Sequence, residues 1–471
     1  MYNHENQYRC TIIRGKSQRE IDDFLPAYAK IISDICPCPK DEFDAKFNEL
    51  FANYIPKDST KKTFDNHRTE IAGQLFGMYY TIPQGTDDSE LYVYPAERTL
   101  KFLEDNDQPA FFKDVCYKMQ FPNGMTIIST TQERIALGIS IRPNCYVLKI
   151  LTLAKYSGLT INKNDIGYYV LNSLDVLQRK ANPLEVIEQI EKDKKENIER
   201  KVHTPGKASS YNMQHINEQI NYLELANLVI TSEDGEVRIN ENERAIIDIF
   251  AEHWNDNPPF DVSSCDLSTV KSRKEFQFKW DEYYSKLSDS AGQFATTVAS
   301  LGIPEEVSTP AKHNEISTIE IGDEGEAFVY KYEKKRVGTF DTRLANKVLH
   351  LGKTKGLGYD IQSVIAEQGD MSEFVKYIEV KSTKRVTEPD INDDLWIDTL
   401  NITRNEWVAA QQHKDFYSIF RVYFVRGNII MYVIENLCQK ERENTVKVTP
   451  MTYRIDFGNS AVDRVIQDAN V

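Results

Sequence analysis

The stretch at residues 376–382, Lys-Tyr-Ile-Glu-Val-Lys-Ser, constrains the fold of this chain more than any other segment. Its residues alternate with the period of two that is typical of a half-buried β-strand. Glu379 and Lys381 therefore share one face of the predicted strand, and Ile378 and Val380 share the other. A carboxylate and an ammonium group that project side by side from a rigid strand can hold a metal ion with a cation beside it, an arrangement suited to hydrolysis.

A second acidic residue precedes this strand at a separation that suits a pair of antiparallel strands. Asp360 stands at the start of an apolar segment, directly after the glycine-rich turn Gly356-Leu357-Gly358. We therefore expect Asp360 to lie beside Glu379 on an adjacent strand. Burying two acids with one lysine is costly unless a cation or mutual pairing compensates the charge. Asp360, Glu379 and Lys381 thus predict a functional site.

A third carboxylate lies on a helix predicted over residues 321–336. Glu326 on this helix can bind a second metal ion or orient a water molecule at the same site. It also stands three residues after Asp323, which is the spacing of an N-terminal capping box. A purely structural role for Glu326 is therefore the alternative.

The segment that follows the 376–382 strand predicts a helix and a hairpin. Residues 403–416 form the helix, in which Thr403 and Glu406 have capping-box spacing. We assign Glu406 to capping and packing, with catalysis as the alternative. Two strands follow at 419–425 and 429–434, joined by a tight turn.

These elements, in this order, resemble a known nuclease core. Their order is similar to the αβββαβ core of the PD-(D/E)xK restriction-endonuclease-like superfamily. It comprises a helix with Glu326, a strand, a strand with Asp360, a strand with Glu379 and Lys381, a helix and a strand. The motifs Gly-Asp-Glu-Gly-Glu, Gly-Tyr-Asp-Ile, Glu-Val-Lys-Ser-Thr and Thr-x-Asn-Glu-Trp resemble a branch found at the C-terminus of prokaryotic restriction and defence proteins. The resemblance covers residues 316 to about 436. No proline precedes Asp360, a position at which the superfamily is lax.

The resemblance implies a magnesium-dependent catalytic site. Hard oxygen ligands suit Mg²⁺, for which Mn²⁺ can substitute, and we expect Asp360, Glu379 and the main-chain carbonyl of Val380 to bind it. In the family the motif lysine lies beside the attacking water, a role that Lys381 inherits by position. Glu326 completes the expected catalytic set. No organic cofactor is expected.

The rest of the chain predicts an α/β multidomain protein. Residues 1–140 are expected to form an α+β DNA-recognition region, with helices at 18–35 and 41–55 and a strand at 90–94. Residues 141–255 are expected to form helix-turn-helix and winged-helix modules, because helices at 145–156 and 163–179 flank a glycine turn, and a helix at 210–225 precedes strands at 228–230 and 237–239. The remaining domains are a helical linker at 256–315 and the nuclease domain at 316–471.

Two groups of residues are candidates for DNA contact. The first lies on one face of the 210–225 helix and could bond base edges in the major groove, although winged helices also serve as packing modules. The second flanks the predicted active site and could contact phosphates. The groups are Ser209, Tyr211, Asn212, His215 and Gln219, and Lys353, Lys355, Lys384 and Arg385.

Composition and motif searches exclude other classes of protein. A formal charge of −15 counts against indiscriminate affinity for nucleic acid. The seven cysteines include no Cys-x-x-Cys pair, so reduced thiols are expected in place of a zinc site. Gly352-Lys353-Thr354 lacks the first glycine of a phosphate-binding loop. No stretch reaches the length of a membrane span and no leader is evident, which predicts a cytoplasmic protein without a membrane partner.

The leading hypothesis is a Mg²⁺-dependent, sequence-specific endonuclease of type II-like restriction that hydrolyses foreign double-stranded DNA. One centre breaks one strand, so we expect at least a transient homodimer, and a cognate DNA methyltransferase is a candidate partner. Two alternatives stay open. One is a modification-dependent restriction nuclease, and the other is a non-cleaving winged-helix regulator with an inactive nuclease scaffold.

Overall fold

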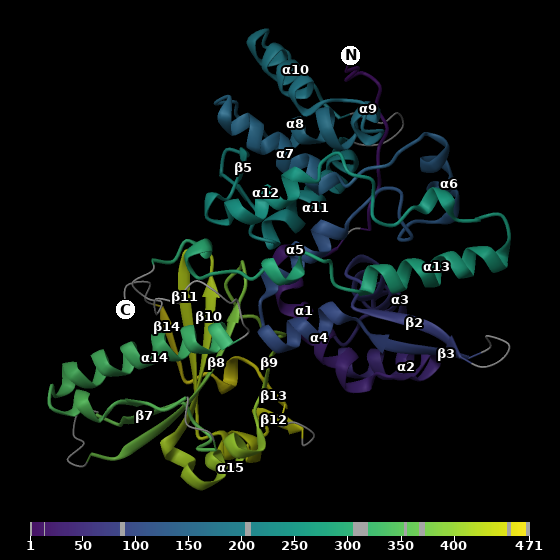
Figure 1. Cartoon of the computed structure of the whole chain (residues 1–471). Helices are drawn as coiled ribbons and strands as arrows, with labels where there is room; N and C mark the ends of the chain where they lie inside the picture. The colour runs from purple at the N-terminus through teal and green to yellow at the C-terminus, as the bar shows by residue number, and fades with distance from the viewer. Residues whose placement is uncertain are drawn as a thin grey trace.

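The structure is a computed structural model that combines an N-terminal region of helices and small sheets with a C-terminal region built on one large sheet (Figure 1). The α/β multidomain architecture expected from the sequence is confirmed. None of the described helices has the length and apolar character needed to cross a membrane. The structure describes residues 2–13, 15–84, 90–202, 209–304, 319–352, 356–366, 373–449 and 454–467, without the side chains of 209–212, 319–321 and 454–456.

The first part of the N-terminal region packs helices against a three-stranded sheet of order β1-β3-β2. Its first helix begins with a capping box between Ser17 and Glu20. Ile21, Leu25 and Ile32 follow at helical spacing, and all three are buried in the core. The elements are α1 (Gln18–Ile35), β1 (Cys38–Pro39), α2 (Lys40–Phe51), α3 (Lys61–Asp65), β2 (Tyr79–Gln84), β3 (Glu90–Pro95) and α4 (Glu97–Asp105).

The second part is mainly helical and occupies the top of the view in Figure 1. Its last long helix, α13, lies on the right of the same view and packs against α6 through Phe276. The elements are α5 (Gln108–Lys118), α6 (Ile128–Ala136), α7 (Pro143–Tyr156), α8 (Lys163–Asp165), α9 (Leu174–Leu177), α10 (Pro183–Lys195), α11 (Ser209–Leu225), β4 (Val229–Thr231), β5 (Val237–Ile239), α12 (Arg244–Glu252) and α13 (Val270–Ser285).

The helix and hairpin predicted over residues 210–239 are present as α11, β4 and β5. The two strands pair antiparallel, and the main-chain N–H of Val237 donates to the carbonyl of Ile161 in the α7–α8 connection. The prediction of one continuous helix over residues 163–179 is wrong. It is divided into α8, a π-helix and α9, because the chain near Ser173 pairs with the N-terminal segment at Gln7.

The C-terminal region is organised around a six-stranded sheet of order β14-β11-β10-β8-β7-β6. Strand β8 is central, antiparallel to β7 and parallel to β10. Helix α14 covers one face and α15 the other (Figure 1). The elements are α14 (Ile319–Phe340), β6 (Leu349–His350), β7 (Ile361–Val364), β8 (Val375–Lys384), β9 (Asp398–Asn401), α15 (Arg404–His413), β10 (Tyr417–Val425), β11 (Asn428–Glu435), α16 (Leu437–Arg442), β12 (Val446–Thr449), β13 (Arg454–Phe457) and β14 (Arg464–Gln467).

Helix α14 approaches β8 so closely that only glycine fits at the crossing. A Cβ atom on Gly325 would lie 1.7 Å from the Ser382 hydroxyl oxygen. Gly338, on the same helix, has room for a methyl group, because its nearest neighbour would be the Ala345 Cβ at 3.6 Å. The crossing therefore fixes the position of α14, and of any side chain it carries, relative to β8.

This contact generates a prediction for a pair of matched substitutions. Gly325→Ala should lower the free energy of unfolding by about 1–3 kcal/mol through overpacking. Gly338→Ala should raise it by about 0.5–1 kcal/mol, because alanine is the better helix former. Adding Ser382→Ala to the first variant should restore part of the loss. Urea unfolding measures all three, and a Gly325→Ala protein as stable as the wild type would contradict the close packing.

Candidate active site

The register of two antiparallel strands brings the first two predicted acids together. Ile361 at the start of β7 pairs with Ile378 on β8, and one step further along this register Asp360 faces Glu379. The Val380 main-chain N–H donates to the Asp360 carboxylate at 2.8 Å, which holds this side chain against β8. The expected neighbourhood of the two carboxylates is therefore present.

Lys381 lies between two carboxylates. Its Nζ is 2.6 Å from the Glu379 Oε1 and 3.0 Å from the Glu406 Oε2. Glu406 also accepts a hydrogen bond from the Thr403 main-chain N–H, and so forms the predicted capping box of α15. The same carboxylate thus caps a helix and contacts the site lysine. The sequence assigns Glu406 to capping and packing, with catalysis as the alternative. The contact with Lys381 could have been inferred from its place in the first turn of the helix that follows the Glu-x-Lys strand.

Glu326 reaches the site from α14. Its Oε2 lies 2.7 Å from the Nε2 of His350 on β6. The alternative, in which Glu326 forms a capping box with Asp323, is wrong. Helix α14 begins at Ile319, so both residues lie inside the helix rather than at its N-cap.

These side chains line one cavity of about 400 Å³. Glu326, Asp360, Glu379, Lys381 and Glu406 form its wall on the C-terminal side. The N-terminal region forms the opposite wall with α1 and the end of α4, including residues 102–106. The site therefore lies where the two regions meet.

The charges of the cavity are unbalanced. Burial, and next the charge of Glu326, raise the pKa of Asp360 to about 6. Burial raises the pKa of Glu379 well above its ordinary value, and Asp360 adds to this effect against the opposing charge of Lys381. Burial alone would lower the pKa of Lys381, but Glu379 and Glu406 outweigh it and raise this pKa. Lys381 thus pairs with two of the four carboxylates. The other cations of the lining, Lys30 and Arg421, pair with acids outside this group, Asp34 and Asp398.

A divalent cation fits this donor set chemically. A hard ion such as Mg²⁺ binds oxygen ligands, and it usually takes only one or two carboxylates from the protein. The cavity offers more carboxylates than its cations neutralise. Among the described residues, no group of three or more His, Cys, Asp or Glu side chains is arranged as a ready-made metal site. Asp360 and Glu379 are the pair placed to hold one.

Of the five candidate DNA-contact residues on α11, the two whose side chains are described do not suit this role. His215 is 6% exposed and Gln219 is 4% exposed, and both pack into the N-terminal core. The His215 ring accepts a hydrogen bond from the Ile12 main-chain N–H. The prediction that His215 and Gln219 bond base edges is therefore wrong for this structure. The side chains of Ser209, Tyr211 and Asn212, and all of Lys353 and Lys355, lie outside the described residues.

Lys384 and Arg385 are also buried, at the contact between the two regions. Lys384 Nζ lies 3.3 Å from the Glu324 Oε2. Arg385 Nη2 lies 2.7 Å from the Asp23 Oδ1, and its Nε lies 3.7 Å from the Asp22 Oδ2. The prediction that these two cations contact phosphates is therefore wrong for this structure, because both already form ion pairs with carboxylates of the protein.

Comparisons with known proteins show similarity to proteins of restriction systems. Residues 2–281, more than half of the chain, match the family described as restriction endonuclease BpuJI, N-terminal. The chain belongs to this family. Residues 325–434, which contain the candidate active site, match the family described as protein NO VEIN, C-terminal. The protein is therefore nuclease-related and similar to proteins of restriction systems.

A solved structure and a curated protein add to this relationship. The structure is the BpuJ1 endonuclease binding domain in complex with pyrene- and phenanthrene-modified DNA, with 47% sequence identity and a TM-score of 0.57. The match covers 60% of this chain and 100% of that chain. A transposase for insertion sequence element IS1151 from Clostridium perfringens is 25% identical over 160 residues, which are 33% of this chain. The chain spans 31% of the length of that transposase.

The burial of Arg385 generates a prediction that separates a structural role from a DNA contact. Arg385→Ala should lower the free energy of unfolding by about 3–5 kcal/mol, because it removes the cation that Asp22 and Asp23 share at a buried contact and leaves Asp22 only its hydrogen bonds from Thr387 and Gln108. Arg19→Ala is the matched control, since Arg19 is 44% exposed in its pair with Asp390 and should change stability by at most about 1 kcal/mol. Equal effects in chemical unfolding would contradict the buried ion pair.

Proposed function

We propose that the protein is a Mg²⁺-dependent endonuclease of restriction type that cleaves double-stranded DNA in defence against foreign DNA. The observation that carries the proposal is the convergence of Asp360, Glu379 and Lys381 in one cavity, with Glu326 beside them. The order of α14, β6, β7, β8, α15 and β10 supports it, because this is the order of a PD-(D/E)xK core.

The N-terminal region supports DNA as the substrate. It belongs to a restriction endonuclease family, and the similar binding domain was solved in complex with DNA. We assign the choice of the DNA sequence to this region. Because α11 packs His215 and Gln219 inward, base contacts must come from other residues of the region.

The chemistry of the site follows from the roles of its residues. Mg²⁺ held by Asp360, Glu379 and the Val380 carbonyl would neutralise charge that develops on the phosphate. Lys381 supplies a fixed positive charge beside Glu379 and can donate a hydrogen bond to a reacting oxygen. Glu406 positions Lys381 from the opposite side. Glu326 adds a carboxylate that can orient a water molecule.

The N-terminal wall of the cavity limits the access of DNA. Residues 102–106 at the end of α4 line the same cavity as Glu379 and Lys381, so they restrict the room for a DNA strand beside these residues. Glu104 and Asp105 on this wall would also repel a phosphate. We therefore expect DNA binding to move the end of α4 away from β8.

Cleavage assays test the proposed activity. Plasmid and phage DNA, methylated and unmethylated, should be cut in Mg²⁺ and left intact in EDTA. Asp360→Asn and Lys381→Met should each reduce the rate at least about 100-fold, the scale expected for the loss of a group that stabilises the transition state. The exposed residues Asp394 and Lys447 provide the matched controls Asp394→Asn and Lys447→Met. Metal-dependent cleavage that survives in the site variants would refute the residue assignment.

Metal binding can be tested without cleavage. In EDTA, Asp360→Asn should raise the free energy of unfolding by about 1 kcal/mol, because it removes a carboxyl group whose pKa is raised by burial and next by the charge of Glu326. Millimolar Mg²⁺ should raise the melting temperature of the wild type and of Asp394→Asn, but not that of Asp360→Asn. An equal response to Mg²⁺ in all three proteins would place the ion elsewhere.

A further inference from the structure

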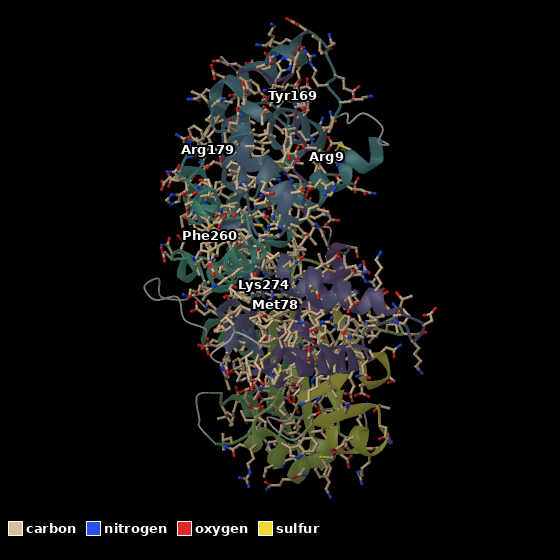
Figure 2. The ribbon with its side chains drawn as sticks, turned by 90° about the vertical axis from the view of Figure 1, so that its right-hand side faces the viewer. Arg9, Met78, Tyr169, Arg179, Phe260 and Lys274 are labelled. Carbon is tan, nitrogen blue, oxygen red and sulfur yellow. The ribbon has the colours of Figure 1, made fainter. Side chains whose placement is uncertain are left out.

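A second cavity, of about 660 Å³, lies in the N-terminal region, away from the candidate active site. The end of α5, the segment after α12 and the end of α13 form its walls. Three aromatic side chains line it, from Tyr117, Phe260 and Tyr283. Phe260 is labelled in Figure 2, where it lies near the middle of the molecule. The comparisons assign no role to this space.

Two buried cations line this cavity without a carboxylate partner. Lys118 is 5% exposed and donates to the main-chain carbonyls of Tyr283 and Lys286. Arg142 is 4% exposed and donates to the carbonyl of Tyr117 at 2.7 Å. Neither forms an ion pair within the described residues, although a buried charge is normally paired or bound to a ligand.

Other buried cations of this protein show how unusual this is. Lys113 pairs with Glu243 at 2.8 Å, and Arg98 pairs with Asp114 at 2.7 Å. Arg134 is buried and lacks a carboxylate within the described residues, but it does not line this cavity. Two uncompensated cations on the wall of one space therefore point to an anion that enters it.

Unused hydrogen-bonding atoms on the same wall support a polar ligand. Arg142 Nε, Tyr283 Oη and Ser288 Oγ are buried without a hydrogen-bond partner in the described part of the chain, and all three residues line the cavity. Leaving such groups unpaired is costly. A ligand that accepts from Arg142 and exchanges hydrogen bonds with the two hydroxyl groups would remove this cost.

The acids on the wall compensate only part of the positive charge. Glu282 pairs with Lys286 at 2.8 Å, and Asp256 pairs with His253 at 2.6 Å, both at the exposed rim. The exposed Asp289 is the third acid of the lining, and its charge opposes the lowering of the Lys118 pKa. Burial, and next the charge of Arg98, lower the pKa of Lys118 to about 7. An anion in the cavity would favour the charged form of this lysine.

We propose that this cavity binds a phosphate ester that carries a nucleobase. A terminal phosphate has a charge of roughly −1.5 to −2 near neutral pH, which Lys118 and Arg142 together would balance. The partly buried rings of Phe260 and Tyr283 offer surfaces for a planar ring, although Lys118 covers one face of Tyr283. The Tyr117 ring is buried and covered by Arg142, so it fixes this cation and does not contact the ligand. The ligand is either a free nucleotide or a nucleotide of a DNA strand. The site does not depend on the proposed nuclease activity.

Calorimetric titration of the full chain tests the proposal in EDTA, where metal-dependent cleavage cannot interfere. Inorganic phosphate and deoxyadenosine monophosphate are the probes, at constant ionic strength. The wild type should bind at one saturable site, and Arg142→Gln should weaken binding about tenfold or more. Lys274→Ala is the matched control, because Lys274 is an exposed lysine of α13 that does not line the cavity (Figure 2).

Variants at exposed positions keep the test valid if Arg142→Gln does not fold. Lys279 is an exposed lysine on the cavity wall, and Lys279→Ala should weaken binding several-fold. The affinity for DNA, measured by fluorescence anisotropy, separates the two sources of the ligand. Weaker DNA binding in the cavity variants identifies a strand nucleotide, and unchanged DNA binding with loss of probe binding identifies a free nucleotide. No saturable binding of either probe, together with unchanged DNA affinity in every variant, would overturn the proposal.

Discussion

The C-terminal region depends on how it accommodates four carboxylates around one ammonium group. Glu326, Asp360, Glu379 and Glu406 reach the same cavity, and Lys381 forms ion pairs with two of them. Groups whose pKa is raised by burial cost stability at neutral pH. The fold keeps them because separate elements fix them: the β7–β8 register, the first turn of α15 and the glycine crossing of α14. A divalent cation would relieve the cost, which links the packing of this region to its proposed chemistry.

Strand β8 connects the site to the N-terminal region. Glu379 and Lys381 lie in its middle, and the main-chain N–H of Lys384 at its end donates to the carbonyl of Asn106. Arg385 follows and pairs with Asp23 on α1. The strand that carries the proposed catalytic residues is therefore also the strand on which the N-terminal region docks. A movement of that region on DNA would change the access to the site directly.

Local patterns in the sequence were enough to predict the elements that build the site. Alternation identified β8, and capping spacing identified the start of α15 at Thr403. The long-range packing was not predictable in the same way. Lys384 and Arg385 resemble solvent-exposed cations in the sequence. Arg385 pairs with acids of α1, more than 300 residues earlier in the chain, and Lys384 pairs with Glu324 of α14. The inward face of α11, with His215, is likewise set by the N-terminal segment at Ile12, which no helical pattern reveals.

The central claim is that Asp360 and Glu379 share a divalent ion. Its most direct test is to crystallise the protein with Mn²⁺ and to locate the ion by anomalous scattering. The account predicts one strong peak between the carboxylates of Asp360 and Glu379, within bonding distance of both. The same peak should be missing in crystals of Asp360→Asn. A protein that binds Mn²⁺ only at other positions, or that leaves the two carboxylates without an ion at saturating Mn²⁺, would contradict the assignment of this cavity as a catalytic centre.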